Sequence, residues 1–156
     1  KFRLNFLVPP EVVDEVTSSM LAGRGIDEAA FCDDLYVDEG SLKDLTSRGH
    51  LMGAHGHSHT PFARMSQDDL EADVRTNVGV LADITGERPE WVSYPHGRDG
   101  ALPGDTKAFC AEFGFRVGVT IRPGWNRASV APSSALRFNT NELPAIFEDI
   151  KSAGAA

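Results

Sequence analysis

Three of the five histidines of this 156-residue chain fall within five positions, at His55, His57 and His59. Neutral imidazole is a good ligand for Zn, Co, Ni and Fe, and a pair of closely spaced imidazoles can be directed at one ion. On a helix His55 and His59 would share a face, whereas on a strand all three would share one. The spacing predicts a metal site; a polar turn whose imidazoles contact only water is the alternative.

A second segment with reactive side chains, Tyr94-Pro95-His96-Gly97, also follows an apolar run of strand length. The histidine cluster follows the short apolar run 51–54 in the same way. In proteins that alternate strands and helices, the carboxyl ends of parallel strands meet at one edge, and sites gather there. We therefore expect the histidine cluster and His96 to open onto the same rim.

The rest of the chain alternates between strand and helix character. Period-two alternation predicts a strand over residues 1–8, and further strands are expected at 91–94, 115–120 and 136–138. Helical spacing predicts helices at 11–20, from Ser41 to Gly49, from the Ser66 N-cap to Gly86, from the Asp105 N-cap to Gly114, and at 141–151. The expected core includes Trp91 and the stripe of Val12, Val13, Val16 and Met20. This alternation predicts an α/β protein with a parallel sheet or barrel, forming one domain over residues 1–156.

Composition excludes several classes of protein. At 41% hydrophobic and 24% charged residues the chain resembles a globular domain, and no apolar run reaches the length of a membrane span. The net charge of −8 argues against a nucleic-acid partner. Cys32 and Cys110 are read as two buried free thiols, with a single disulfide as the alternative. A chain that opens inside a strand suggests residues before Lys1, where any signal peptide would lie, so no localisation is predicted.

The segment Gly49–Phe62 (GHLMGAHGHSHTPF) is similar to the second motif of the NodB-homology polysaccharide deacetylases, carbohydrate esterase family 4. Val92–Gly97 (VSYPHG) resembles the third motif of that family, and the likeness covers nearly the whole chain. The resemblance implies a distorted (β/α) barrel, incomplete at the N-terminus because the first strand is missing. It also implies that His55 and His59 ligate a divalent metal, with zinc as the first choice and cobalt, nickel or iron as alternatives.

The activity that the resemblance implies is hydrolysis of acetyl groups on an N- or O-acetylated carbohydrate or a related small amide. In the family a metal polarises the acetyl carbonyl and activates water. A backbone N–H of the third motif stabilises the oxyanion, and here that amide belongs to His96. Tyr94 and Trp125 are the expected substrate contacts. For Trp125, stacking on a sugar ring and packing beneath a loop remain alternatives.

The chain also departs from the family pattern. The first motif, Thr-Phe-Asp-Asp, supplies the catalytic base and the third metal ligand, and it is absent; Asp33-Asp34 is interpreted as a solvated helix or loop face instead. Ser93 stands where an Arg is common, and Leu136-Arg-Phe138 lacks the general-acid His. The third ligand, base and acid are therefore unassigned. The alternatives to an enzyme of this family are a non-catalytic carbohydrate- or metal-binding domain on the same fold and, more remotely, an amidohydrolase-like metal hydrolase.

Overall fold

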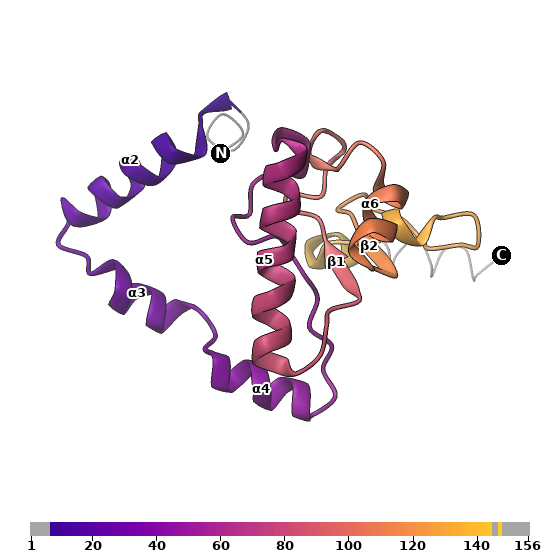
Figure 1. Cartoon of the computed structure of the whole chain (residues 1–156), viewed down its shortest axis with the longest axis horizontal. Helices are drawn as coiled ribbons and strands as arrows, with labels where there is room; N and C mark the ends of the chain where they lie inside the picture. The colour runs from indigo at the N-terminus through magenta and orange to yellow at the C-terminus, as the bar shows by residue number, and fades with distance from the viewer. Residues whose placement is uncertain (1–6, 145–146, 148–156) are drawn as a thin grey trace.

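A computed structural model describes residues 7–144 and 147, and Figure 1 shows how its elements are arranged. The helices are α2 (Pro10–Ala22), α3 (Glu28–Leu35), α4 (Glu39–Ser47), α5 (Gln67–Thr85) and α6 (Thr106–Phe113). The strands are β1 (Trp91–Ser93) and β2 (Val117–Val119). Short 3-10 turns lie at Phe62–Arg64, Asp99–Ala101, Pro132–Ser134 and Thr140–Glu142. In this part of the chain, no helix combines the length and the apolarity that crossing a membrane requires.

Four extended segments lie side by side in chain order, and all of them are parallel. β1 and β2 pair directly, Ala54 forms a parallel bridge to Val92, and Val119 forms one to Ala135. Helix α5 connects the segment at Ala54 to β1, and α6 connects β1 to β2. The predicted α/β alternation is thus confirmed, and consecutive parallel order is what the wall of a barrel requires. The closed barrel itself stays a prediction.

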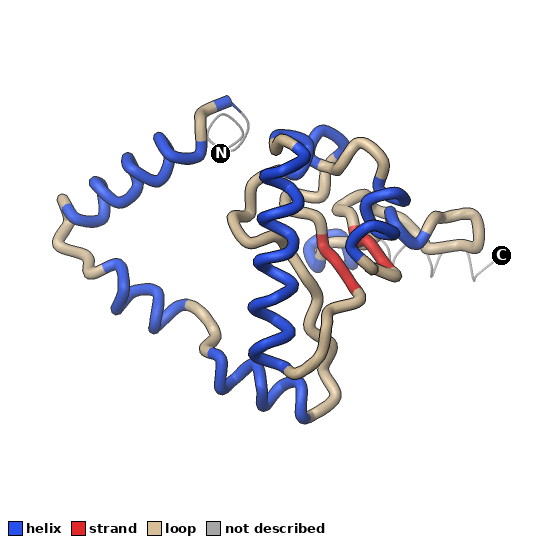
Figure 2. The backbone as a smooth tube through the Cα atoms, viewed as in Figure 1, coloured by secondary structure: helices blue, strands red, loops and turns tan. Residues whose placement is uncertain are grey.

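One face of this sheet carries the hydrophobic core. Helix α5 contributes apolar residues three and four apart, and α6 adds an aromatic cluster, as helices that cover a sheet do. The buried cluster consists of Ala54, Phe62, Leu70, Val74, Val78, Val92, Tyr94, Leu102, Phe109, Cys110, Phe113 and Phe115. Figure 2 shows both strands beside α5 in the same compact part of the molecule.

The opposite face of the sheet is open in the described structure. Val92 points into the core, whereas its neighbour Trp91 is 43% exposed because side chains alternate along a strand. The core position predicted for Trp91 is therefore wrong. Trp91, Ser93 and Val119 line a groove of about 470 Å³ on this side, together with Leu51.

The N-terminal helices α2 and α3 lie apart from α5 and the sheet (Figure 1). Helix α2 contacts α3, and α4 contacts α5. The prediction of a helix at 11–20 is confirmed, but its stripe is not part of the core: Val12, Val16 and Met20 are exposed. The spacing of these residues correctly predicts an apolar face on α2, but no other described element covers that face.

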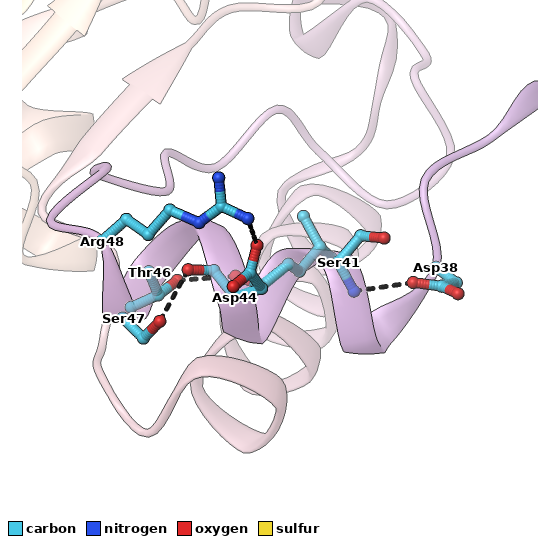
Figure 3. Close-up of polar contacts among 7 residues, drawn as sticks. Asp38, Ser41, Asp44, Thr46, Ser47 and Arg48 are labelled. Carbon is cyan, nitrogen blue, oxygen red and sulfur yellow. Dashed lines mark hydrogen bonds and ion pairs between the residues drawn. The ribbon is translucent and has the colours of Figure 1, made fainter.

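Helix α4 is fixed by local polar contacts, which Figure 3 shows. The Asp38 carboxylate accepts a hydrogen bond from the Ser41 N–H at 2.7 Å and acts as N-cap, so the helix begins before the predicted start at Ser41. The same bond lowers the pKa of Asp38. Asp44 and Arg48 form an ion pair one turn apart. Gly49 follows with φ +87°, and this confirms the predicted helix end.

The other helix ends agree with the sequence prediction. Ser66 caps α5 and Asp105 caps α6, while Gly86 and Gly114 end these helices with φ +76° and +71°. Both cysteines are free, although only Cys110 is buried and Cys32 is partly exposed.

Three predicted segments differ from the structure or lie largely outside it. Of the predicted strand at 1–8 only Leu7 and Val8 are described, and neither is in a strand. The last pairing falls at Ala135 rather than at 136–138. Most of the helix predicted at 141–151 lies outside the described residues.

Candidate metal centre

The structure gathers three of the predicted site residues at one edge of the sheet. His55 directly follows the bridge at Ala54, and His96 follows the end of β1. The rings of His55 and His59 lie 4.9 Å apart between centroids, and those of His59 and His96 lie 4.7 Å apart. Three imidazoles from two loops therefore form a row along the carboxyl ends of neighbouring parallel segments.

The ring of His55 is oriented by the adjacent strand. Its Nδ1 lies 2.6 Å from the backbone oxygen of Ser93, and a carbonyl can only accept a hydrogen bond. Nδ1 therefore donates, and in the neutral ring the lone pair is on Nε2. Metal-binding histidines usually have this arrangement, in which one ring nitrogen donates to a carbonyl or carboxylate and the other binds the ion.

His59 and His96 also share an uncommon backbone conformation. Among the described non-glycine residues, these two have positive φ angles, +58° and +62°. An L-residue in the left-handed region is strained, and such strain persists where surrounding contacts hold it, often at functional sites. Both outliers fall on residues that the sequence singled out for chemistry.

The loop that carries the histidine cluster rests on α5. The Asp73 carboxylate accepts hydrogen bonds from the His57 and Ser58 N–H groups, and the Asn77 side-chain oxygen accepts one from the His55 N–H. Neither of these α5 residues is among the site residues predicted from the sequence. The available signal was their spacing, because Asp73 and Asn77 fall on the apolar side of α5 that includes Leu70.

Tyr94 is part of the core rather than of the rim. Its side chain is 1% exposed, its Oη donates to the Ser133 oxygen at 2.6 Å, and Cys110 Sγ lies 3.3 Å away. Burial raises the pKa of Tyr94 far above its ordinary value, and burial also raises the pKa of Cys110. The position of the Tyr94 side chain gives no support to the predicted substrate contact.

Trp125 lies at the surface, 58% exposed, with its ring edge-to-face against Phe138 at 5.2 Å. The neighbouring Asn126 side chain bonds both the N–H and the oxygen of Leu136, at 2.8 Å each, and so fixes this loop. A partly supported, exposed indole can stack on a flat ligand face. Its contact with a sugar stays a prediction.

The side chains present fit part of a metal site. Two imidazoles, one with its outer nitrogen available for binding, suit zinc and similar ions. Within residues 7–144 and 147, no group of three or more His, Cys, Asp or Glu side chains is arranged to hold an ion. Asp33 and Asp34 are exposed on α3, away from the sheet (Figure 1). The described residues thus offer two ligands and leave the third unassigned.

Comparison with known proteins identifies the family. The pattern of the polysaccharide deacetylase family matches residues 8–118, and the chain belongs to this family. The matched stretch contains the histidine cluster and His96, whereas Trp125 lies beyond it. No curated protein sequence matches the chain.

Solved structures of deacetylases share the fold. The BpsB deacetylase domain from Bordetella bronchiseptica is 21% identical, with a TM-score of 0.57 over 68% of this chain and 52% of that one. The Streptococcus pyogenes deacetylase PplD, solved with acetate, is 20% identical, with a TM-score of 0.59 over 65% of this chain and 44% of that one. IcaB from Ammonifex degensii is 17% identical, with a TM-score of 0.54 over 70% and 51%. The chain thus matches about half the length of these structures.

Proposed function

We propose that this chain carries part of a metal-dependent deacetylase site, which releases acetate from an N- or O-acetylated carbohydrate. Family membership supports deacetylation of carbohydrate as the general activity. The observation that carries the metal-dependent form is the His55 ring, whose Nδ1 is 2.6 Å from the Ser93 oxygen while His59 lies beside it. That arrangement presents Nε2 of His55 for ligation.

Each residue of the proposed site has a distinct role. His55 and His59 hold the ion, for which zinc is the first choice and cobalt, nickel or iron are alternatives. When bound, such an ion polarises a carbonyl and lowers the pKa of a bound water. The backbone N–H of His96 would donate to the negatively charged oxygen that the acetyl carbonyl oxygen becomes when water adds to the carbonyl carbon. Trp125 stacks on the sugar ring, and the products are acetate and a free amine or hydroxyl.

A second candidate function is a non-catalytic carbohydrate- or metal-binding domain. It is favoured by one observation: within the described part of the chain, no carboxylate joins the histidines in an arrangement that could hold an ion. A site of two histidines without a base would bind a ligand and leave it unchanged.

Zinc titration of single-residue variants tests the proposal. We expect His55→Ala and His59→Ala each to weaken zinc binding by more than about 100-fold, because each removes a direct ligand, whereas loss of a residue that only orients a ligand costs about 10–100-fold. His57→Ala is the matched control, since its exposed ring lies in the same loop and has no proposed ligand role. Competition with a chromophoric chelator measures the affinity.

The outcomes separate the candidate functions. Zinc binding that persists in both His55→Ala and His59→Ala contradicts the ligand assignment, and loss in His57→Ala shows that the wrong histidines were chosen. If zinc binds as expected, acetate release from an N-acetylated chitooligosaccharide decides between the enzyme and the binding domain.

A further inference from the structure

The histidine loop has exposed side chains and an anchored backbone. Two side chains of α5 hold its backbone. Asp73 accepts hydrogen bonds from the His57 and Ser58 N–H groups, both at 2.8 Å. Asn77 accepts one from the His55 N–H at 2.9 Å. Asp73 and Asn77 are four residues apart, so they stand on one face of α5. Three amides of a single short loop are therefore fixed by one turn of one helix.

Asp73 is an unusual choice for this position. Its side chain lies in the core-facing surface of α5, the residue being 9% exposed, and a buried carboxylate is costly unless its oxygens are hydrogen-bonded. Each oxygen accepts one backbone N–H, and among the described residues no ion pair involves Asp73. Its interactions are directed at the loop.

The fit between loop and helix is tight at Gly56. This residue has φ +73°, and a Cβ atom there would lie 3.0 Å from Asp73 Oδ1, 3.1 Å from the Phe62 ring and 3.2 Å from Pro95. The glycine lets the main chain approach the carboxylate closely. It would also leave the loop free to adopt many conformations if the anchors were removed.

His55 is consequently held at two points. Asn77 fixes its main chain, and the Ser93 oxygen at the end of β1 fixes its ring. His59, four residues further on, lies beyond the amides that Asp73 binds. The separation of the two imidazoles therefore depends on the backbone between them, which is the segment that Asp73 and Asn77 restrain.

We propose that Asp73 and Asn77 are positioning residues that set the metal affinity of the histidine pair. They keep residues 55–58 in the conformation in which the His55 and His59 rings converge. This inference rests on the proposed metal-binding function. If only a fraction of molecules holds the competent loop conformation, the apparent affinity falls by that fraction, so loosening the loop weakens binding without changing a ligand.

The test compares isosteric variants with a core control. We expect Asp73→Asn to weaken zinc binding about 10–100-fold, because the amide replaces one acceptor by a donor that faces a backbone N–H. Asn77→Leu weakens binding likewise, and Asn77→Asp, which keeps an acceptor oxygen, retains it. Val78→Ala is the control: it removes buried volume from the same helix, lowers the melting temperature and leaves zinc affinity unchanged.

A second measurement needs no metal. Amide hydrogen exchange of His57 and Ser58 should become faster in Asp73→Asn and stay slow in Val78→Ala. The inference is overturned if Asp73→Asn keeps both the zinc affinity and the slow exchange, or if Val78→Ala weakens zinc binding as much as Asp73→Asn does. If the proposed metal-binding function is wrong, the unaltered chain and His55→Ala will bind zinc equally well or not at all. The exchange rates of His57 and Ser58 still show in that case whether Asp73 holds the loop.

Discussion

The hydroxyl of Tyr94 connects three parts of the core. It extends from the end of β1, donates to the Ser133 oxygen and lies beside the Cys110 thiol of α6. A Cβ atom on Gly118 would lie 2.2 Å from the Tyr94 oxygen, so the glycine on β2 provides the space for this contact. Tyr94 thereby anchors, in the core, the start of the turn that contains His96.

Replacement of Tyr94 by Phe should destabilise the fold and flatten its alkaline pH dependence. Loss of a bond to a buried carbonyl costs about 1–3 kcal/mol at neutral pH. Burial raises the pKa of Tyr94, so the phenol stays neutral in the folded chain and ionises in the unfolded chain above about pH 10. The folded state then binds more protons, and the stability due to this group falls as the pH rises past 10.

Urea denaturation of both proteins at about pH 7 and about pH 11 measures this difference. We expect the protein that keeps Tyr94 to lose roughly 1 kcal/mol more than Tyr94→Phe between these conditions. Both proteins carry Cys110→Ala, because the Cys110 thiol contacts the Tyr94 hydroxyl and its own pKa depends on that contact. Equal losses would show that the Tyr94 phenol ionises as easily in the folded as in the unfolded chain.

At the level of residues, sequence spacing predicted the histidines but not their supports. Imidazoles at His55 and His59 are conspicuous because few residue types bind metals. Asp73 was not singled out, since a charged residue beside Val74 has no visible partner until the loop is folded over it. Tyr94 follows a strand, but the sequence does not say whether its ring turns toward the rim or the core.

Helix α5 is the element that joins the core to the candidate site. Its apolar side covers the sheet, and the same side carries Asp73 and Asn77 to the histidine loop. Ser66 and Gly86 define its two ends through an N-cap bond and a left-handed C-cap. Because these two side chains hydrogen-bond the histidine loop, α5 restrains the loop's backbone.

Gly79 lies inside α5 and provides a test of what stabilises this helix. Gly79→Ala should stabilise the chain by about 1 kcal/mol, because alanine has the higher helix propensity and nothing lies within 4 Å of the new Cβ atom. Gly118→Ala is the opposite case and should destabilise by about 1–3 kcal/mol or more through overpacking. Thermal unfolding ranks the two variants, and a destabilising Gly79→Ala would contradict the open space described beside α5.

Elements with strong local signals were predicted well. Ser66, Gly86, Asp105 and Gly114 determine helix ends by their own backbone and side-chain chemistry, which depends little on distant residues. The strands were predicted less well, since their limits depend on which segments pair. Pairing at Ala135, one position before the predicted strand, is decided by β2 and not by local sequence.

At the scale of the whole molecule, the described residues form a packed part around α5, α6 and the sheet, and an N-terminal arm made of α2 and α3 (Figure 1). Helix α3 has no buried residue. The arm therefore gains little from the burial of apolar surface, which is the main source of stability in folded domains. Its opening should cost less free energy than opening of α5.

Limited trypsin digestion should detect this difference. Arg24 lies in the exposed turn between α2 and α3, whereas Arg75 lies within α5 and is paired with Glu71. We expect cleavage after Arg24 to precede cleavage after Arg75, because protease needs an unfolded segment of chain. Mass spectrometry of early fragments identifies the order, and simultaneous cleavage at both sites would show that arm and packed part open together.

At this largest scale, the α/β class and the family were predictable, but the arrangement of the layers was not. Alternating strands and helices, together with the motif around His55, indicate the class and the relatives. The exposure of Trp91 and of the α2 stripe was not predicted. Apolar residues were expected to lie in a core, but the described structure has no layer over them. Patterns show which faces are apolar and leave open what covers them.

Two hydrogen bonds between Asn126 and Leu136 join the ends of a surface loop. They close a short ring of chain, and the far side of that ring, residues 127–131, is mostly exposed. Lengthening a loop whose ends are already joined costs only about 0.6 kcal/mol per doubling. A reporter peptide or an affinity handle could thus be grafted at 127–131, and the molecule could be immobilised or followed by fluorescence through this loop.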